Sequence, residues 1–331
     1  MSHSAIVLFA KQRGLTSFTS LHQIKRALGT KKVGHTGTLD SFADGLLVVM
    51  VDGLTRLASH VTAFDKKYEA ILQFGTQTDT LDPSGEIIES TALPLLDDLK
   101  KAVAYHTGNI EQFPPLYSAI HIDGKRASDI ARSGKTVEMP SRNITVFKAE
   151  IQDIVCIEDR VSYAKVSFHV SKGTYIRSLA RDIAKMAQSS AHLIGLRRTA
   201  VGSFALDDAV GSALLPEFTI DYAIKKVQAE KADTTGTEKP AKIDVSQEIL
   251  ETLHYMTPTF SQECGFTPLI LKNSHKFDFN NGKPLKISFF EEFLPQEKEY
   301  AVFTKDSTFS GLIKITQENE IFKLKYIFVS K

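Results

Sequence analysis

The sequence predicts an α+β protein with a large first domain and a small, β-rich second domain. The chain has 331 residues, of which 42% are hydrophobic and 24% charged, and this length suits two domains better than one compact core. Helix and strand patterns are mixed before residue 228, whereas short β-rich runs follow residue 243. Between them, residues 228–243 (QAEKADTTGTEKPAKI) hold few large apolar side chains, so we expect a linker there.

Periodic patterns predict the elements of the first domain in order. Apolar side chains at positions 21, 24 and 28 recur at helical spacing, so we expect a helix that Gly29 ends and a loop over residues 31–40. Residues 164–170 (AKVSFHV) alternate apolar and polar side chains, as a half-buried strand does. A helical apolar pattern begins at Ile176, which makes residues 171–175 (SKGTY) a strand-to-helix corner, where backbone N–H groups can face a ligand.

The second domain shows β-rich runs separated by polar turns, a pattern typical of a small barrel or sandwich. The runs are TPLIL (267–271), KPLKISFF (283–290), YAVFT (300–304), FSGLIKI (309–315) and FKLKYIFV (322–329).

Composition excludes several classes of protein. The apolar run at residues 5–10 is far shorter than the roughly 20 residues that span a bilayer, and it lacks the flanks of a signal peptide. We therefore expect a cytoplasmic protein with no membrane partner. Cys156 and Cys264 are far apart, with no Cys/His spacing, so neither a disulfide nor a zinc site is predicted.

The net charge of +1 gives no reason by itself to expect a nucleic acid partner, but the charge is unevenly spread. Residues 1–60 carry 7 Lys or Arg against 3 acids, residues 171–205 carry 6 against 1, and residues 65–112 carry 4 against 9. The two basic segments suit one surface for an anionic ligand, although ordinary solvated faces explain such asymmetry equally well.

Two motif-like stretches are discounted. Residues 79–86 (DTLDPSGE) resemble part of a calcium loop, but Leu81 occupies a ligand position, so we expect a solvated turn. Residues 133–136 (SGKT) match the end of the phosphate-loop motif GxxxxGK[ST], but Asp129 occupies the position of the motif's first glycine.

Five blocks of sequence resemble, in order and spacing, the bacterial tRNA pseudouridine 55 synthases of the TruB family. They are GHTGTLDSFADGLL (34–47), KKYEAILQFGTQTDTLDPSGE (66–86), FPPLYSAIHIDGKRASDIARSG (113–134), SKGTYIRSLARDI (171–183) and HLIGLRRTAVGSF (192–204).

The resemblance implies the pseudouridine synthase fold, with a mixed, mainly antiparallel sheet in a catalytic domain at 1–227. Within it, residues of about 114–147 match the inserted segment that clamps RNA in the family. After the linker, residues 244–331 look loosely like the small PUA-like β-barrel that binds RNA in relatives, and an unrelated β-barrel remains an alternative.

The function implied by the resemblance is isomerisation of uridine 55 in the TΨC loop of tRNA. The reaction involves no redox change, so we expect no cofactor and no metal. We expect a monomer that binds tRNA without an obligate protein partner. A pseudouridine synthase with another RNA target, or a non-catalytic tRNA-binding or folding protein, are the alternatives. The presence of both Asp40 and Arg177 favours an enzyme, because a protein that only binds tRNA needs neither.

The family's functional residues fall on matching positions of this chain. Asp40, in GHTGTLD, is the expected catalytic carboxylate, acting at C1′ or C6 or through a glycal intermediate. Arg177 is expected to hold this carboxylate bidentately, which a lysine cannot do. Tyr68 is expected to stack on the flipped uracil and to take part in catalysis. The other pocket residues implied are His35, which helps to displace the base, and Tyr175 and Leu196, which line the pocket.

The candidates for phosphate contacts, which make RNA binding salt-dependent, are Lys31, Lys32, Arg132, Arg142, Lys172, Arg197 and Arg198. The chain departs from the family pattern at residues 11–14 (KQRG, where KPxG is usual), at Ser41 after the catalytic Asp, and at His121 and Ser128 in the clamping segment. These departures bear on the stiffness of the loops and on the tRNA contacts.

Overall fold

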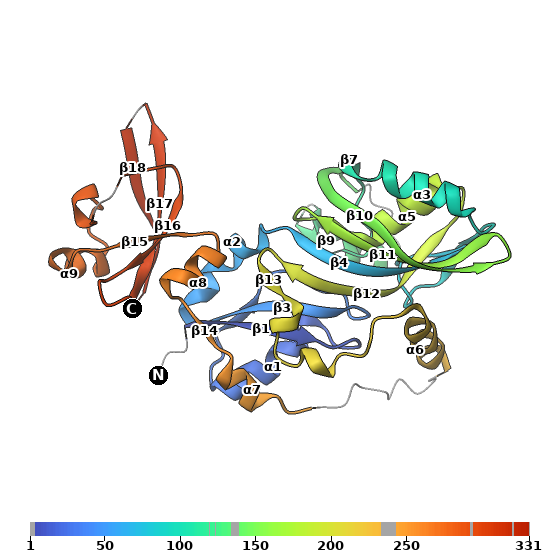
Figure 1. Ribbon diagram of the computed structural model, residues 1–331, viewed down its shortest axis with the longest axis horizontal. Helices are drawn as coiled ribbons and strands as arrows, with labels where there is room; N and C mark the ends of the chain where they lie inside the picture. The colour runs from blue at the N-terminus through green and yellow to red at the C-terminus, as the bar shows by residue number, and fades with distance from the viewer. Residues whose placement is uncertain are drawn as a thin grey trace.

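A computed structural model describes residues 4–118, 120–122, 124–133, 139–232, 243–291, 294–319 and 321–330, apart from the side chains at 121, 126, 131 and 132. A large sheet flanked by helices forms most of the molecule, and a smaller C-terminal sheet stands at one end (Figure 1).

Over the described residues, ten strands form the large sheet in the order β14-β1-β3-β12-β4-β11-β10-β7, with β2 beside β3 and β13 beside β12. Among these described pairings, β3 and β12 are parallel and the others antiparallel. The mixed, mainly antiparallel sheet is therefore confirmed. Its strands are β1 (Ala5–Lys11), β2 (Val33–His35), β3 (Asp44–Val51), β4 (Lys66–Phe74), β7 (Gly108–Gln112), β10 (Arg142–Ile157), β11 (Arg160–Val170), β12 (Ala191–Val201), β13 (Phe204–Ala205) and β14 (His254–Tyr255).

Helices α3 (Leu96–Tyr105) and α5 (Ile176–Met186) cover one face of the sheet (Figure 1). The apolar side of α5 packs with strands β4, β10, β11 and β12 in the largest apolar cluster, which confirms the helix predicted from Ile176. On the opposite face, α6 (Ile220–Ala232) packs against Ile71 and Ile194. The active-site elements described below lie on the side of α5.

The first helix, α1 (Ser17–Leu28), buries Leu21, Ile24 and Leu28 against β1 and β3, as their spacing predicts. It ends at Gly29, whose φ of 61° is the left-handed conformation that glycine adopts without strain. The other side of β1 and β3 packs against α2 (Ala58–Thr62) and α8 (Pro258–Glu263). No helix in the described ranges is long and apolar enough to cross a membrane.

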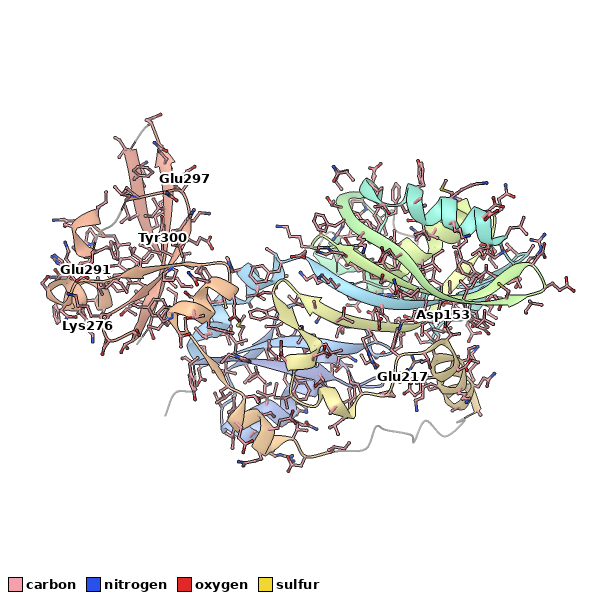
Figure 2. The ribbon with its side chains drawn as sticks, in the orientation of Figure 1. Asp153, Glu217, Lys276, Glu291, Glu297 and Tyr300 are labelled. Carbon is pink, nitrogen blue, oxygen red and sulfur yellow. The ribbon has the colours of Figure 1, made fainter. Side chains whose placement is uncertain are left out.

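The C-terminal part forms a small β domain, as predicted. In the part of it that the structure describes, four strands pair in the order β15 (Thr267–Ile270), β16 (Glu299–Phe303), β17 (Phe309–Glu318) and β18 (Ile321–Val329). Tyr300, labelled in Figure 2, is buried in the core of this sheet. The expected strand over 283–290 is wrong: there the chain forms a 3-10 turn, Ile287–Phe289, and Phe290 makes a single bridge to Leu271.

The linker differs from the expectation at both ends. Helix α6 continues to Ala232, because Ile220, Ala223 and Val227 anchor it on the sheet, and residues 233–242 lie outside the described ranges. Beyond them, α7 (Ser246–Glu251) and β14 pack on the first domain, where β14 pairs with β1. The chain thus remains part of the first domain beyond position 244.

Candidate active site

Asp40 lies in the loop between β2 and β3, and three buried side chains hold the backbone of that loop. Ser17 Oγ accepts from the Leu39 N–H at 2.9 Å and donates to the Leu39 carbonyl at 3.1 Å. Lys11 Nζ donates to the Ala43 carbonyl at 2.6 Å. Arg198 Nη2 donates to the Gly37 carbonyl at 3.1 Å. The carboxylate of Asp40 therefore projects from a fixed loop.

Lys11 is fully buried behind this loop, and the resemblance gave it no role. Burial lowers the pKa of Lys11 to about 7, while the negative charges of Asp44 and Asp40 oppose this shift. A lysine at the end of an apolar run can be noticed in the sequence. The sequence does not reveal its contact with the loop of Asp40, because that contact joins distant positions.

Asp40 forms an ion pair with Arg177, in the first turn of α5. Arg177 Nε lies 2.9 Å from Oδ2 of Asp40, and Nη2 donates to Oδ1 at 3.2 Å. The Arg177 side chain is 5% exposed, whereas the Asp40 side chain is 36% exposed. One hydrogen bond and one close ion-pair contact, to different oxygens, orient the carboxylate while leaving it partly open to a ligand.

The other edge of the Arg177 guanidinium is occupied as well. Nη1 donates to the Thr80 carbonyl at 2.8 Å and lies 3.6 Å from Oδ2 of Asp82, while Nη2 donates to the Tyr117 carbonyl at 3.0 Å. Oδ1 of Asp82 accepts from Thr80 Oγ1 at 2.8 Å and from the Ser84 N–H at 3.0 Å. Arg177 is therefore held in place before any ligand arrives.

The expected solvated turn at 79–86 is thus wrong in one respect. Asp82 is only 7% exposed and faces Arg177. The same carboxylate accepts hydrogen bonds from Thr80 and Ser84, and these local bonds account for the turn-like sequence. The contact with α5 is long-range, which explains why the local pattern did not reveal it.

Burial and neighbouring charges shift the pKa of Asp40 in opposite directions. Burial raises the pKa of the Asp40 carboxyl, and the nearby Asp82 raises it further. Arg177 and Lys11 act in the other direction. The pair with Arg177 thus offsets the cost of an ionised carboxylate in a partly dry site.

Tyr68 and Leu196 lie on adjacent strands, on the face of the sheet that carries the loop of Asp40. Tyr68 is on β4 and Leu196 on β12, where Leu196 is paired with Ala70. Leu196 and Leu39, the neighbour of Asp40, belong to one apolar cluster, and Tyr68 packs against it while half-buried. The structure thus brings both residues to the side of the sheet that carries Asp40.

The remaining pocket residues flank this region. Tyr175 precedes α5 at the predicted corner and is half-buried. His35 ends β2 and is also half-buried, and its pKa is lowered by burial and by the charge of Arg198. The imidazole is therefore favoured in its neutral form.

The expectation that Arg197 and Arg198 contact phosphates is corrected by their burial. Arg197 donates from Nε and Nη2 to the two oxygens of Asp44, at 2.6 and 2.9 Å. Arg198 is 1% exposed and donates to the carbonyls of Leu46 and Gly37. Both side chains stabilise the β3–β12 junction under the loop of Asp40, so two adjacent arginines are a misleading sign of an RNA surface.

The other basic candidates differ in position. Lys31, Lys32 and Lys172 are exposed. Arg142 lies over the ring of Tyr175 at 5.5 Å, and its Nη1 donates to the Gly173 carbonyl at 3.5 Å.

The segment between β7 and β10, residues 113–141, is called the flap segment below. In its described part, it contains β8 (His121–Ile122), β9 (Lys125–Arg126) and α4 (Ala127–Arg132). The side chains of Arg132 and His121 lie outside the described part. Residues 142–147 belong to β10 of the large sheet, so the insertion ends earlier than the expected 147.

Across the described residues, His, Cys, Asp and Glu form no group of three that could hold a metal ion.

Comparisons with known proteins agree on one family. The model of the TruB family pseudouridylate synthase (N terminal domain) matches residues 25–176. The tRNA pseudouridine synthase B of Treponema denticola is 41% identical over 309 residues, which cover 88% of this chain and 86% of that protein. The protein of the same name from Treponema pallidum is 36% identical over 345 residues and 94% of each chain. The fold is similar to that in a crystal structure of a Cbf5-Nop10-Gar1 complex, with a TM-score of 0.63, 20% sequence identity, and coverage of 99% of this chain and 84% of that one.

Proposed function

The chain belongs to the TruB family of pseudouridine synthases, and we propose that it isomerises uridine 55 in the TΨC loop of tRNA to pseudouridine. In this reaction the N1–C1′ glycosidic bond breaks, the uracil rotates, and C5 bonds to C1′. The proton on C5 is lost and N1 gains one, so atoms and electrons balance without an external oxidant or reductant. The reaction needs a nucleophilic or proton-transferring group beside the sugar and base.

The observation that carries the proposal is the pair formed by Asp40 and Arg177. A carboxylate that is partly exposed, on a fixed loop, and bound on both oxygens by a buried guanidinium can act on a sugar or base without reorienting. This role is common to attack at C1′, attack at C6 and a glycal route, because each begins from ionised Asp40, acting as a nucleophile at C1′ or C6 or as the base that removes a proton from C2′.

The neighbouring side chains suit an extruded uracil. Flipping a base costs a few kcal/mol of unstacking, which a pocket offsets by stacking and hydrogen bonding. Tyr68 offers an aromatic ring, Leu196 an apolar wall and Tyr175 a second ring at the corner. His35, at the end of β2 and near the loop of Asp40, is proposed to occupy the position that the base leaves.

The tRNA arm would contact exposed cations around this pocket. Lys31, Lys32, Lys172 and Arg142 are proposed to bind phosphates, together with Arg132 in the flap segment. The C-terminal sheet is proposed as a second RNA-binding unit. We further propose that the protein works as a monomer in the cytoplasm without an obligate protein partner.

The alternatives have less support. Similarity at 20% identity to a Cbf5 complex concerns the fold and does not favour another RNA target. A protein that only binds or folds tRNA would need neither the Asp40–Arg177 pair nor the buried network behind it.

The test uses an unmodified tRNA transcript and maps pseudouridine by its stable carbodiimide adduct. We expect one stop to reverse transcription, at position 55, and none when a transcript carries cytidine there. Product at another position in both transcripts would contradict the proposed specificity, and no product in either would contradict the proposed activity.

A further inference from the structure

A buried amide joins the beginning of the flap segment to the corner that precedes Arg177. Gln112 is the last residue of β7, and its side chain is 0% exposed. Its Nε2 donates to the carbonyl oxygen of Tyr175 at 3.1 Å, and its Oε1 accepts from the Tyr175 N–H at 2.8 Å. One side chain thus bonds to both backbone groups of Tyr175, as a paired strand residue does, while the Tyr175 carbonyl also accepts from the Leu179 N–H at 3.0 Å.

The backbone of Tyr175 sets the start of helix α5. Its extended conformation, with φ of −101° and ψ of 109°, turns the chain into the helix that carries Arg177. Arg177 Nη2 then donates both to Asp40 and to the carbonyl of Tyr117, which lies in the flap segment. Gln112, Tyr175, Arg177 and Tyr117 therefore close a ring of contacts, and Arg177 joins this ring to Asp40.

Two prolines restrict the short stretch of chain between Gln112 and Tyr117. Pro114 and Pro115 are both buried, and each fixes its own φ and restricts the residue before it. At the other end of the flap segment, Arg142 reaches the Gly173 carbonyl and the ring of Tyr175. The residues that flank the segment, Gln112 and Arg142, therefore both contact the corner at residues 173–175.

We propose that Gln112 is a positioning residue for the isomerisation, which ties the flap segment to the Tyr175 corner so that Arg177 holds Asp40 in its reactive orientation. The proposal rests on the function proposed above and adds a residue to that site. A purely structural role for Gln112 predicts a different result, namely lower stability with an unchanged active site.

The test is Gln112→Met, which keeps the length of the side chain and removes both hydrogen bonds. We expect the single-turnover rate at saturating enzyme to fall about 10- to 100-fold, since small misplacements of a catalytic group have effects of this size. The Kd for tRNA should stay within about threefold, because Gln112 is buried away from solvent. Arg177 and Lys11 lower the pKa of Asp40, whereas Asp82 raises it. A displaced Arg177 lowers this pKa less, so the acid limb of the rate–pH profile should move to higher pH.

The matched control is Gln152→Met, on β10. This glutamine donates to Ser167 Oγ at 3.1 Å, away from the corner, so the parental rate and pH profile are expected. Gln112→Asn serves as the second variant, since a shorter amide can keep at most one of the two bonds, and we expect an intermediate rate.

Several results would overturn the proposal: parental rates in the Gln112 variants, a rate loss with no shift of the acid limb, or failure of both variants to fold. A parent protein that forms no pseudouridine on tRNA would instead overturn the proposed function itself.

Discussion

Replacing Arg177 by lysine tests how much the guanidinium contributes beyond its charge. A lysine nitrogen cannot reach both oxygens of Asp40 and also the carbonyls of Thr80 and Tyr117. Hydrogen bonds to charged groups contribute roughly 1.5–3 kcal/mol each, and two are lost at least. Because Asp40 is 36% exposed, the lower end applies, so the barrier rises by about 3 kcal/mol and the rate falls about 10²-fold.

The assay is a single-turnover measurement with tRNA tritiated at uridine C5, in which tritium is released as the new bond forms. Arg181→Lys, one turn further along α5, is the matched control, because Arg181 contacts Asp182 and the Phe113 carbonyl but not Asp40. Its rate should stay within about threefold of the parent, because Arg181 makes no contact with Asp40 and its ion pair with Asp182 is partly exposed. An Arg177→Lys rate equally close to the parent, in a folded protein, would refute the argument that bidentate geometry matters.

Three further outcomes follow from the site. Because burial raises the Asp40 pKa above its ordinary value of 3.8, the rate should fall as the pH decreases through that raised value, and an acid limb at or below 3.8 would contradict this. Arg197→Met should lower the free energy of unfolding by about 3–5 kcal/mol in chemical denaturation, since it leaves Asp44 unpaired, without changing the salt dependence of tRNA binding. Lys172→Gln should leave stability unchanged and reduce the slope of log Kd against log salt by about 0.7–0.9, and an unchanged slope would exclude a phosphate contact.

Local patterns predicted the elements that depend on local spacing. The helices at α1 and α5, the half-buried strand over 164–170 and the corner before Ile176 follow from apolar periodicity, which burial on one face produces. The run over 283–290 has similar composition, but it meets a neighbour only at its end, where Phe290 bridges Leu271, and it forms no continuous ladder, so composition alone misled there.

The site could be predicted only where sequence blocks resemble a family. Asp40 and Arg177 are separated by 137 positions, and nothing local to either residue reveals the pair. Lys11, Asp82 and Gln112 escaped prediction for the same reason, since each acts through a contact with a distant segment.

The central claim, that Asp40 performs the chemistry, is tested most directly by Asp40→Asn in a single-turnover reaction with unmodified tRNA. Asparagine keeps the shape of the side chain but removes the charge that Arg177 binds. We expect the variant to bind tRNA with a Kd within about tenfold of the parent and to form no pseudouridine at position 55. Turnover by Asp40→Asn at a rate close to that of the parent would contradict it.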